Sequence, residues 1–192
     1  MRRARAWVPL VVVCVVPGLL VACSGRDTTT LVPTEAQPPY VCDGVPRRGV
    51  ELLTGAPDAG VTQEGQWGSD ERNFYCTVTV EQEPGLFRGL TVTEQRVAVS
   101  IFGDAATAEE ELRATSGQVI DADESGVGAV YGSTEGTLTA AWACGERVLW
   151  VEAQGVFDDG RAAEEDLSNL LVSMLPWVCG DDDVPARTVE GR

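Results

Sequence analysis

A run of acidic residues near the middle of the chain matches the first half of a calcium-binding loop. In Asp121-Ala122-Asp123-Glu124-Ser125-Gly126, acidic or polar residues occupy positions one, three and five, and glycine occupies position six. The match fails at position twelve, which is Gly132, where the motif needs a bidentate glutamate. We interpret this run as a solvated turn, and the sequence predicts neither a metal site nor a cofactor.

The remaining acidic runs are interpreted as solvated surface. They are Glu109-Glu110-Glu111, Glu164-Glu165-Asp166 and Asp181-Asp182-Asp183. The chain has no His and no Lys, so Ser–His and Cys–His nucleophile pairs are impossible within it. A pair of carboxylates could in principle run a hydrolase. Because 30 acidic residues make chance neighbours common, we do not expect an enzyme, and we predict no catalytic residue.

The charge of the chain excludes one large class of partner. Acidic residues number 30 and basic residues 14, which gives a formal net charge of −16. Such a chain repels the phosphates of nucleic acids. Nucleic-acid binding is therefore not expected.

Four cysteines are expected to form two disulfides. Of the six in the sequence, Cys14 and Cys23 lie in an N-terminal segment that is treated separately below. The other four are Cys42, Cys76, Cys144 and Cys179. An even number in an exported domain is typical of a disulfide framework, and four cysteines allow three pairings. No C-x-x-C spacing favours a redox or zinc site.

A predicted hairpin favours one of these pairings. The runs 138–144 and 147–153 flank Gly145-Glu146, a two-residue loop suited to a type II′ turn. In that register Trp142 faces Leu149 and Ala140 faces Val151, and Cys144 shares their apolar face. A helix predicted over 161–175, stopped by Pro176, would pack on this face and lead to Cys179. We therefore predict Cys144–Cys179, and by difference Cys42–Cys76.

The order of predicted elements favours an α+β fold with an antiparallel sheet of about five strands, helices mainly on one face, and two disulfides. Asp43 is predicted to cap the first helix, and 56–72 is predicted to be a loop. The predicted elements are a helix over 45–54, strands over 73–81 and 90–102, a helix over 105–115, short strands over 118–121 and 126–131, the hairpin, and the final helix.

The first 22 residues have the parts of an export signal. Arg2, Arg3 and Arg5 precede an apolar stretch, 7–20, that is short for a membrane-spanning helix and contains two prolines. The tetrad Leu20-Val21-Ala22-Cys23 resembles the lipobox of bacterial lipoproteins. That resemblance implies cleavage before Cys23 and a diacylglyceryl group on its sulfur, which would anchor the chain to the membrane. An ordinary secretory signal and an uncleaved anchor are the alternatives.

The rest of the chain is divided into three parts. Residues 23–39 are expected to form the lipidated Cys23 and a flexible tether, because prolines and threonines dominate them. Residues 40–180 are predicted to form a single domain, and 181–192 a disordered acidic tail.

Together these features resemble the small actinobacterial lipoproteins of unknown function, and the two-disulfide plan also resembles the extracellular sensor domains of some actinobacterial kinases. The features are the lipobox, Cys42, Cys76, the late hairpin and the terminal helix. The resemblance implies a lipid-anchored domain on the outer face of the cell membrane. We expect it to bind or sense an envelope protein or a small ligand without catalysis. The alternatives are a scaffold without a ligand pocket and a carboxylate hydrolase. Trp67 and Trp150 are the candidate contacts of such a binding surface.

Overall fold

The computed structural model describes residues 29–55, 60–64, 74–80, 95–102, 105–132, 136–154 and 161–188. Within these residues the fold is a seven-stranded antiparallel sheet in the order β3-β4-β5-β9-β8-β7-β6, with a separate two-stranded hairpin, β1-β2. The strands are β1 Tyr40–Cys42, β2 Val45–Pro46, β3 Gly60–Glu64, β4 Phe74–Val80, β5 Gln95–Phe102, β6 Gln118–Ile120, β7 Val127–Gly132, β8 Thr137–Cys144 and β9 Arg147–Gln154.

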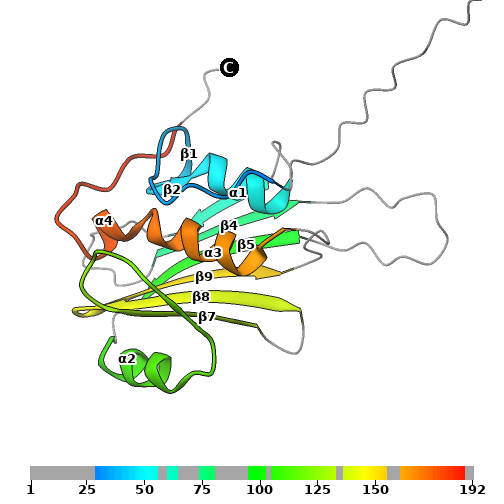
Figure 1. Ribbon diagram of the computed structural model, residues 1–192. Helices are drawn as coiled ribbons and strands as arrows, with labels where there is room; N and C mark the ends of the chain where they lie inside the picture. Colours follow the sequence, from blue (N-terminus) through cyan, green and yellow to red (C-terminus); the bar gives the residue numbers. More distant parts are fainter. Residues whose placement is uncertain are drawn as a thin grey trace, which may run out of the picture.

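Helices lie on both faces of this sheet (Figure 1). They are α1 Arg47–Thr54, α2 Ala105–Ala114, α3 Ala163–Val172 and α4 Leu175–Val178. The helices α1, α3 and α4 lie together on one face, and α2 packs on the other, against β7, β8 and β9. The prediction of an antiparallel α+β fold with two disulfides is confirmed. The expectation of about five strands is wrong, because the large sheet has seven.

The extra edge strand is β3, which lies in a segment predicted to be a loop. Its residues alternate between exposed and half-buried, and all five pair with β4. The strand contains Gly60 and mostly polar residues, so its hydrophobic alternation is weak. Strand β3 forms because one edge of β4 has backbone N–H and C=O groups that do not pair with β5, the neighbour of β4 on the other side.

The hairpin of β8 and β9 has the predicted register. Trp142 pairs with Leu149, Ala140 with Val151 and Leu138 with Ala153. These residues belong to the main core under α1, α3 and α4, and each is at most 8% exposed. The alternate residues, Ala141, Ala143 and Val148, form a smaller core with Ala108 and Leu112 of α2. Strict alternation of two apolar faces explains why this central hairpin is covered on both sides.

Two disulfides cross-link the fold in the predicted pairs. Cys42 on β1 is bonded to Cys76 on β4, with 6.2 Å between their Cα atoms. Cys144 at the end of β8 is bonded to Cys179, which follows α4, with 5.7 Å between Cα atoms. The first bond joins the β1-β2 hairpin to the sheet, and the second joins the helical layer to it.

The final helical region differs from the single helix predicted over 161–175. The helix α3 ends at Val172, and a separate turn of helix, α4, begins at Leu175 and includes Pro176. Proline is tolerated in the first turn of a helix because the missing N–H has no intrahelical acceptor there. Pro176 therefore lies in the first turn of a helix instead of ending one. The first helix also differs, since it begins at Arg47 and its cap position is Pro46, not Asp43.

Contacts of the fold extend beyond the predicted domain limits of 40 and 180. Val32, assigned from sequence to a flexible tether, is 2% exposed in the main core. Residues 185–188, assigned to a disordered tail, bond to the β1-β2 hairpin, with Gly44 N–H donating to the Pro185 carbonyl over 2.7 Å and Thr188 N–H donating to the Tyr40 carbonyl over 3.1 Å. The described parts of the predicted tether and of the predicted tail thus belong to the folded structure.

Candidate functional site

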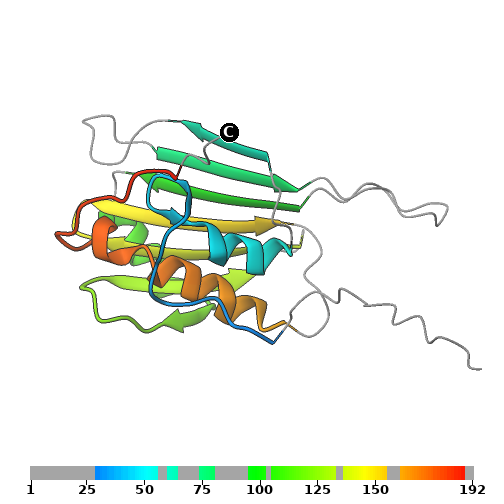
Figure 2. The same cartoon turned by 90° about the horizontal axis from the view of Figure 1, so that it is seen from above.

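The segment that runs from Thr30 to Pro39 forms one wall of a pocket, and it is held at both ends. It crosses the helical layer beside α3 and reaches β1 next to α1 (Figure 2). At its start, Val32 N–H donates to Asp166 Oδ1 over 2.8 Å, and Arg161 Nη2 donates to the Thr30 carbonyl over 3.0 Å. A chain fixed in this way presents a defined surface to a ligand.

Asp166 is the centre of this attachment. Its Oδ2 accepts hydrogen bonds from Nε and Nη2 of Arg161, over 2.7 Å and 2.6 Å, and both side chains are 1% exposed. The interpretation of Asp166 as a solvated residue is therefore wrong, although its neighbours Glu164 and Glu165 are exposed. Buried charges are stable when they are paired and fully hydrogen-bonded, and here the backbone of the Thr30 segment supplies the remaining partners.

The other end of the segment joins α1. Arg47 N–H, in the first turn of that helix, donates to the Pro39 carbonyl over 2.9 Å. The next residue, Tyr40, is buried and meets Trp177 edge-to-face, with 6.3 Å between ring centroids. In the first turn of α1, a Cβ on Gly49 would lie 2.7 Å from Leu170 Cδ1 and 3.2 Å from Val32 Cγ1. Glycine at this position lets α1 approach both α3 and the segment closely.

Between the segment and α1 lies a pocket of about 570 Å³, which we call the α1 pocket. It is within the size range of small-molecule sites in proteins. Its lining combines prolines with residues of both charge signs, and it consists of Pro33, Thr34, Glu35, Gln37, Pro38, Pro39, Pro46, Arg47, Arg48, Gly49 and Glu51. Sequence reasoning missed this site because its two walls come from a predicted tether and a predicted helix.

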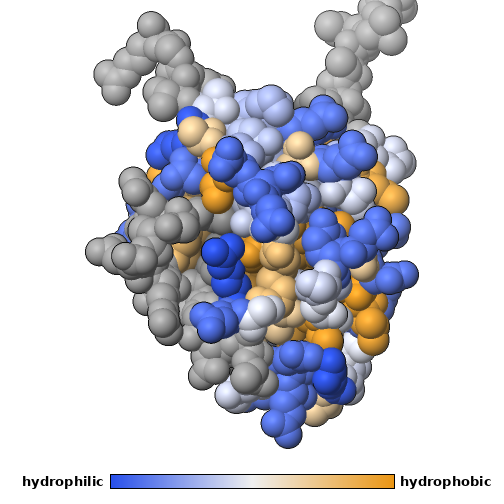
Figure 3. All heavy atoms as spheres, turned by 90° about the vertical axis from the view of Figure 1, so that its left-hand side faces the viewer, coloured by the Kyte–Doolittle hydropathy of each residue, from blue (hydrophilic) through white to orange (hydrophobic). Residues whose placement is uncertain are grey.

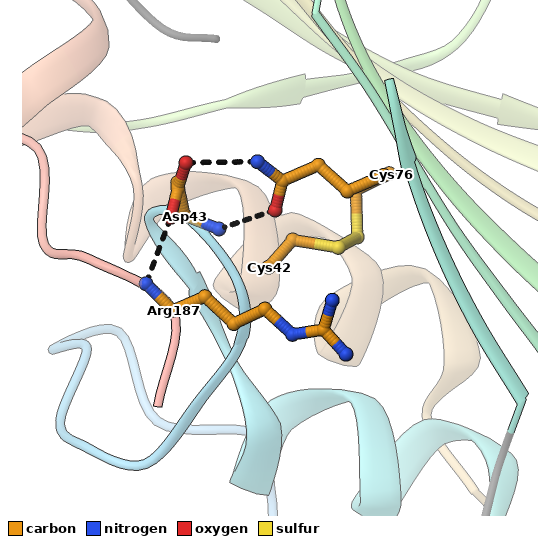
Figure 4. Close-up of a disulfide and its surroundings, with 5 residues drawn as sticks. Cys42, Asp43, Cys76 and Arg187 are labelled. Carbon is orange, nitrogen blue, oxygen red and sulfur yellow. Dashed lines mark hydrogen bonds between the residues drawn. A yellow bond between two sulfur atoms is a disulfide. The ribbon is translucent and has the colours of Figure 1, made fainter. Parts of the chain in front are cut away.

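A second cluster fixes the C-terminal segment beside the Cys42–Cys76 disulfide (Figure 4). Asp43 accepts hydrogen bonds from Gln63 Nε2 and from the backbone N–H of Arg187, each over 2.8 Å. Asp43 N–H in turn donates to Gln63 Oε1 over 3.1 Å. These bonds connect β1-β2, β3 and the C-terminal segment, so the side chain predicted to cap a helix instead joins three parts of the chain.

Trp150, one of the two predicted binding residues, lies on the α2 face of the sheet. It is half-buried and packs against the smaller core. Across the sheet it pairs with Ser100 of β5, which pairs with Tyr75 of β4. Tyr75 is 37% exposed, and its alternation with the buried Phe74 and Cys76 could have identified it from the sequence. The other predicted residue, Trp67, lies outside the described residues, as does the predicted lipidation site Cys23.

Tyr131 has a perturbed pKa on the same face. Burial raises the pKa of this side chain above its ordinary value of 10.0, and the negative charges of Glu152 and Glu111 raise it further. Tyr131 pairs with Thr139, which pairs with Glu152, so the phenol and the carboxylate are two strands apart. The raised pKa extends to higher pH the range in which the Tyr131 phenol is protonated and can donate a hydrogen bond.

Two of the acidic runs singled out in the sequence, 109–111 and 121–126, belong to neither cluster. Glu109 pairs with Arg113 on the outside of α2, and Asp121–Gly126 connects β6 to β7. The described part of the chain contains no group of three or more His, Cys, Asp or Glu side chains placed to hold a metal ion. It also contains no helix long and apolar enough to cross a membrane.

The surface at one end of the molecule is mostly hydrophilic. On the side shown in Figure 3, hydrophobic residues lie in small groups among hydrophilic ones. A ligand or partner on this side would therefore meet a mixed surface.

Comparison of the chain with protein-family models, curated proteins and solved structures gives no match.

Proposed function

We propose that the chain is a lipid-anchored lipoprotein of the actinobacterial type, held at the outer face of the cell membrane by Cys23, whose domain binds a ligand or an envelope protein without catalysis. The α1 pocket is the site that the geometry favours for this binding. The observation that supports the proposal best is the position of this pocket on the segment that leads directly from Cys23 into the fold.

Two disulfides support the location. Each joins parts of the chain 34 or 35 residues apart and connects different layers of the fold. Disulfides of this structural kind persist in oxidising compartments and are rare in the cytosol. The pairing therefore favours a domain that folds after export.

Binding is favoured by the way the pocket is built. The wall formed by 33–39 is attached through a buried ion pair at one end and a backbone hydrogen bond at the other. Several prolines in that wall restrict its backbone further. A preorganised wall loses little conformational entropy when a ligand binds, which raises affinity.

Thiol trapping in intact cells tests the location. Cells are quenched in acid, free thiols are alkylated, and the four domain cysteines are mapped by mass spectrometry. We expect Cys42, Cys76, Cys144 and Cys179 to be recovered as the two disulfides. A chain with Cys23→Ala should not be cleaved before position 23 and should keep its first 22 residues. Recovery of the four as alkylated thiols would contradict an extracytoplasmic domain.

The scaffold alternative differs in what the pocket does. A scaffold would capture an envelope partner equally well when the charges of the α1 pocket are removed, whereas a ligand-binding domain would lose its ligand. Turnover of a substrate by the purified chain, abolished by replacing one acidic residue, would instead favour the carboxylate hydrolase.

A further inference from the structure

We propose that the α1 pocket binds the zwitterionic phosphate–amine headgroup of a membrane lipid, of the phosphoethanolamine type. This inference rests on the proposed function in one respect, namely that Cys23 holds the domain at a membrane. The pocket chemistry is argued from the structure and can be tested without the anchor.

The first argument is reach. The attachment at Thr30 and Val32 leaves only residues 23–29 between Cys23 and the fold. Seven residues span at most about 25 Å when fully extended. A domain of roughly 150 residues is about 40 Å across. A lipid anchor at Cys23 therefore keeps Thr30, where the chain enters the fold, close to the lipid surface. The pocket wall begins at Pro33, directly after Val32.

The second argument is the charge of the lining. Arg47 and Arg48 supply two positive groups, and Glu35 and Glu51 supply two negative ones. Within the described part of the chain, no ion pair or side-chain hydrogen bond engages Glu35, Arg48 or Glu51. Guanidinium groups bind phosphate oxygens in a bidentate manner, and carboxylates accept hydrogen bonds from a primary ammonium. A headgroup that carries both ions satisfies both halves of the lining.

The third argument concerns net charge. The chain has a formal net charge of −16, which repels anionic lipid surfaces at long range. A zwitterionic headgroup has no net charge and is not repelled. Most of the lining residues, including Glu35 and Arg48, are exposed, so a headgroup can enter from the surface while its acyl chains stay in the bilayer.

The experiment uses the mature chain from residue 23 with Cys23→Ser, which has no lipid and retains every described residue. Its binding is measured by flotation with vesicles of phosphatidylcholine alone, or with phosphatidylethanolamine or phosphatidylglycerol added. We expect binding to the ethanolamine vesicles only. Phosphatidylcholine has the same phosphate, but its quaternary amine has no N–H donors for the glutamates. Comparison with it therefore separates the contribution of the arginines from that of the glutamates.

Soluble probes distinguish a headgroup site from a general lipid or anion site. O-phosphoethanolamine should shift the NMR signals of residues 33–39 and 47–51, whereas inorganic phosphate should shift them only at concentrations at least about tenfold higher. Equal responses to phosphate, or stronger binding to phosphatidylglycerol vesicles, would overturn the proposal in favour of a simple anion site.

Matched variants locate the binding. Arg48→Gln and Glu35→Gln should each weaken ethanolamine-vesicle binding about tenfold, which corresponds to the loss of one charge-assisted contact. Arg113→Gln and Glu110→Gln change the same charges on α2, at exposed positions on the opposite face of the sheet, and should leave binding unchanged. Equal effects of both sets would contradict a site in the α1 pocket. Because the tested chain has no lipid, failure here leaves the anchor at Cys23 standing, and failure of the anchor leaves this result standing.

Discussion

Arg161 and Asp166 form an ion pair in which both side chains are 1% exposed, although they lie beside acidic residues that face solvent. The pair joins the start of α3 to the segment entering the fold from the N-terminal side, because Asp166 also accepts the Val32 N–H. Attachment of that segment therefore depends on a charge buried in the helical layer. If Cys23 is lipidated, this is the point at which the anchor meets the domain.

Asp166→Asn should destabilise the fold strongly. The change leaves the Arg161 guanidinium buried without its counter-charge, and removing one partner of a buried pair costs about 3–5 kcal/mol. Urea unfolding followed by circular dichroism measures the loss. Glu165→Gln removes the adjacent, exposed carboxylate and is the control, with an expected change below about 0.5 kcal/mol. Equal effects of the two substitutions would show that the buried pair contributes nothing specific.

Loss of either disulfide should lower stability to a similar extent. The bonded cysteines are 34 and 35 residues apart, and loops of this size correspond to about 3–4 kcal/mol in the chain-entropy model. The double variants Cys42→Ser/Cys76→Ser and Cys144→Ser/Cys179→Ser are compared by thermal unfolding. Peptide mapping without reductant checks the pairing, and a peptide that joins Cys42 to Cys144 would contradict it.

Gly128→Ala should also destabilise the sheet. Gly128 pairs with Trp142 across β7 and β8, and a Cβ at position 128 would lie only 2.2 Å from Cε3 of that indole. Overpacking of this kind costs about 1–3 kcal/mol. Gly132→Ala, in the same strand, is the control, because among the described residues the atom nearest to its Cβ would be Leu138 Cδ1, at 4.0 Å. Tolerance of alanine at 128 would show that Trp142 does not lie across the glycine.

Tyr131 should make stability fall at high pH. Because the pKa of the folded phenol is raised above 10.0, the unfolded state loses this proton first as the pH rises. The contribution is intact below about pH 10 and is lost as the pH passes through the folded pKa. Tyr131→Phe should remove this part of the decline in urea unfolding measured across that range.

The cause of the Tyr131 shift can be tested separately by ultraviolet difference titration. Glu152→Gln should bring the pKa of Tyr131 closer to its ordinary value, because it removes the negative charge that contributes most after burial. Glu146→Gln changes an exposed charge in the β8-β9 turn and serves as the control. Titration of Tyr131 at or below pH 10.0 in the unchanged chain would contradict the assigned environment.

The parts of the fold that follow from local patterns were predictable from the sequence. Alternation in 138–153 predicted the hairpin register, and the register predicted which face carries Cys144. The Cys144–Cys179 pairing followed, since the terminal helix had to cover that face. These inferences worked because side chains alternate strictly along a strand, so a single apolar face determines the register.

The parts that depend on distant contacts were not predictable. Asp166 looked like its solvated neighbours, and its partners include the Val32 N–H, 134 residues away. One wall of the α1 pocket, 33–39, follows directly after this contact and is held at its other end by the bond from Arg47 N–H to the Pro39 carbonyl. Strand β3 likewise depends on backbone pairing with β4, which its polar sequence does not signal. Trp150 was predicted from the sequence as a binding contact, but its packing near α2 depends on the three-dimensional arrangement.

The most direct test of the account is an intact-mass measurement on the chain purified from the membrane fraction, beside a Cys23→Ala variant. We predict a mature chain that begins at Cys23, carries a diacylglyceryl group and contains two disulfides, together with an unprocessed variant. An unmodified chain released into the medium would contradict the anchor, and with it the membrane-bound function proposed for this protein.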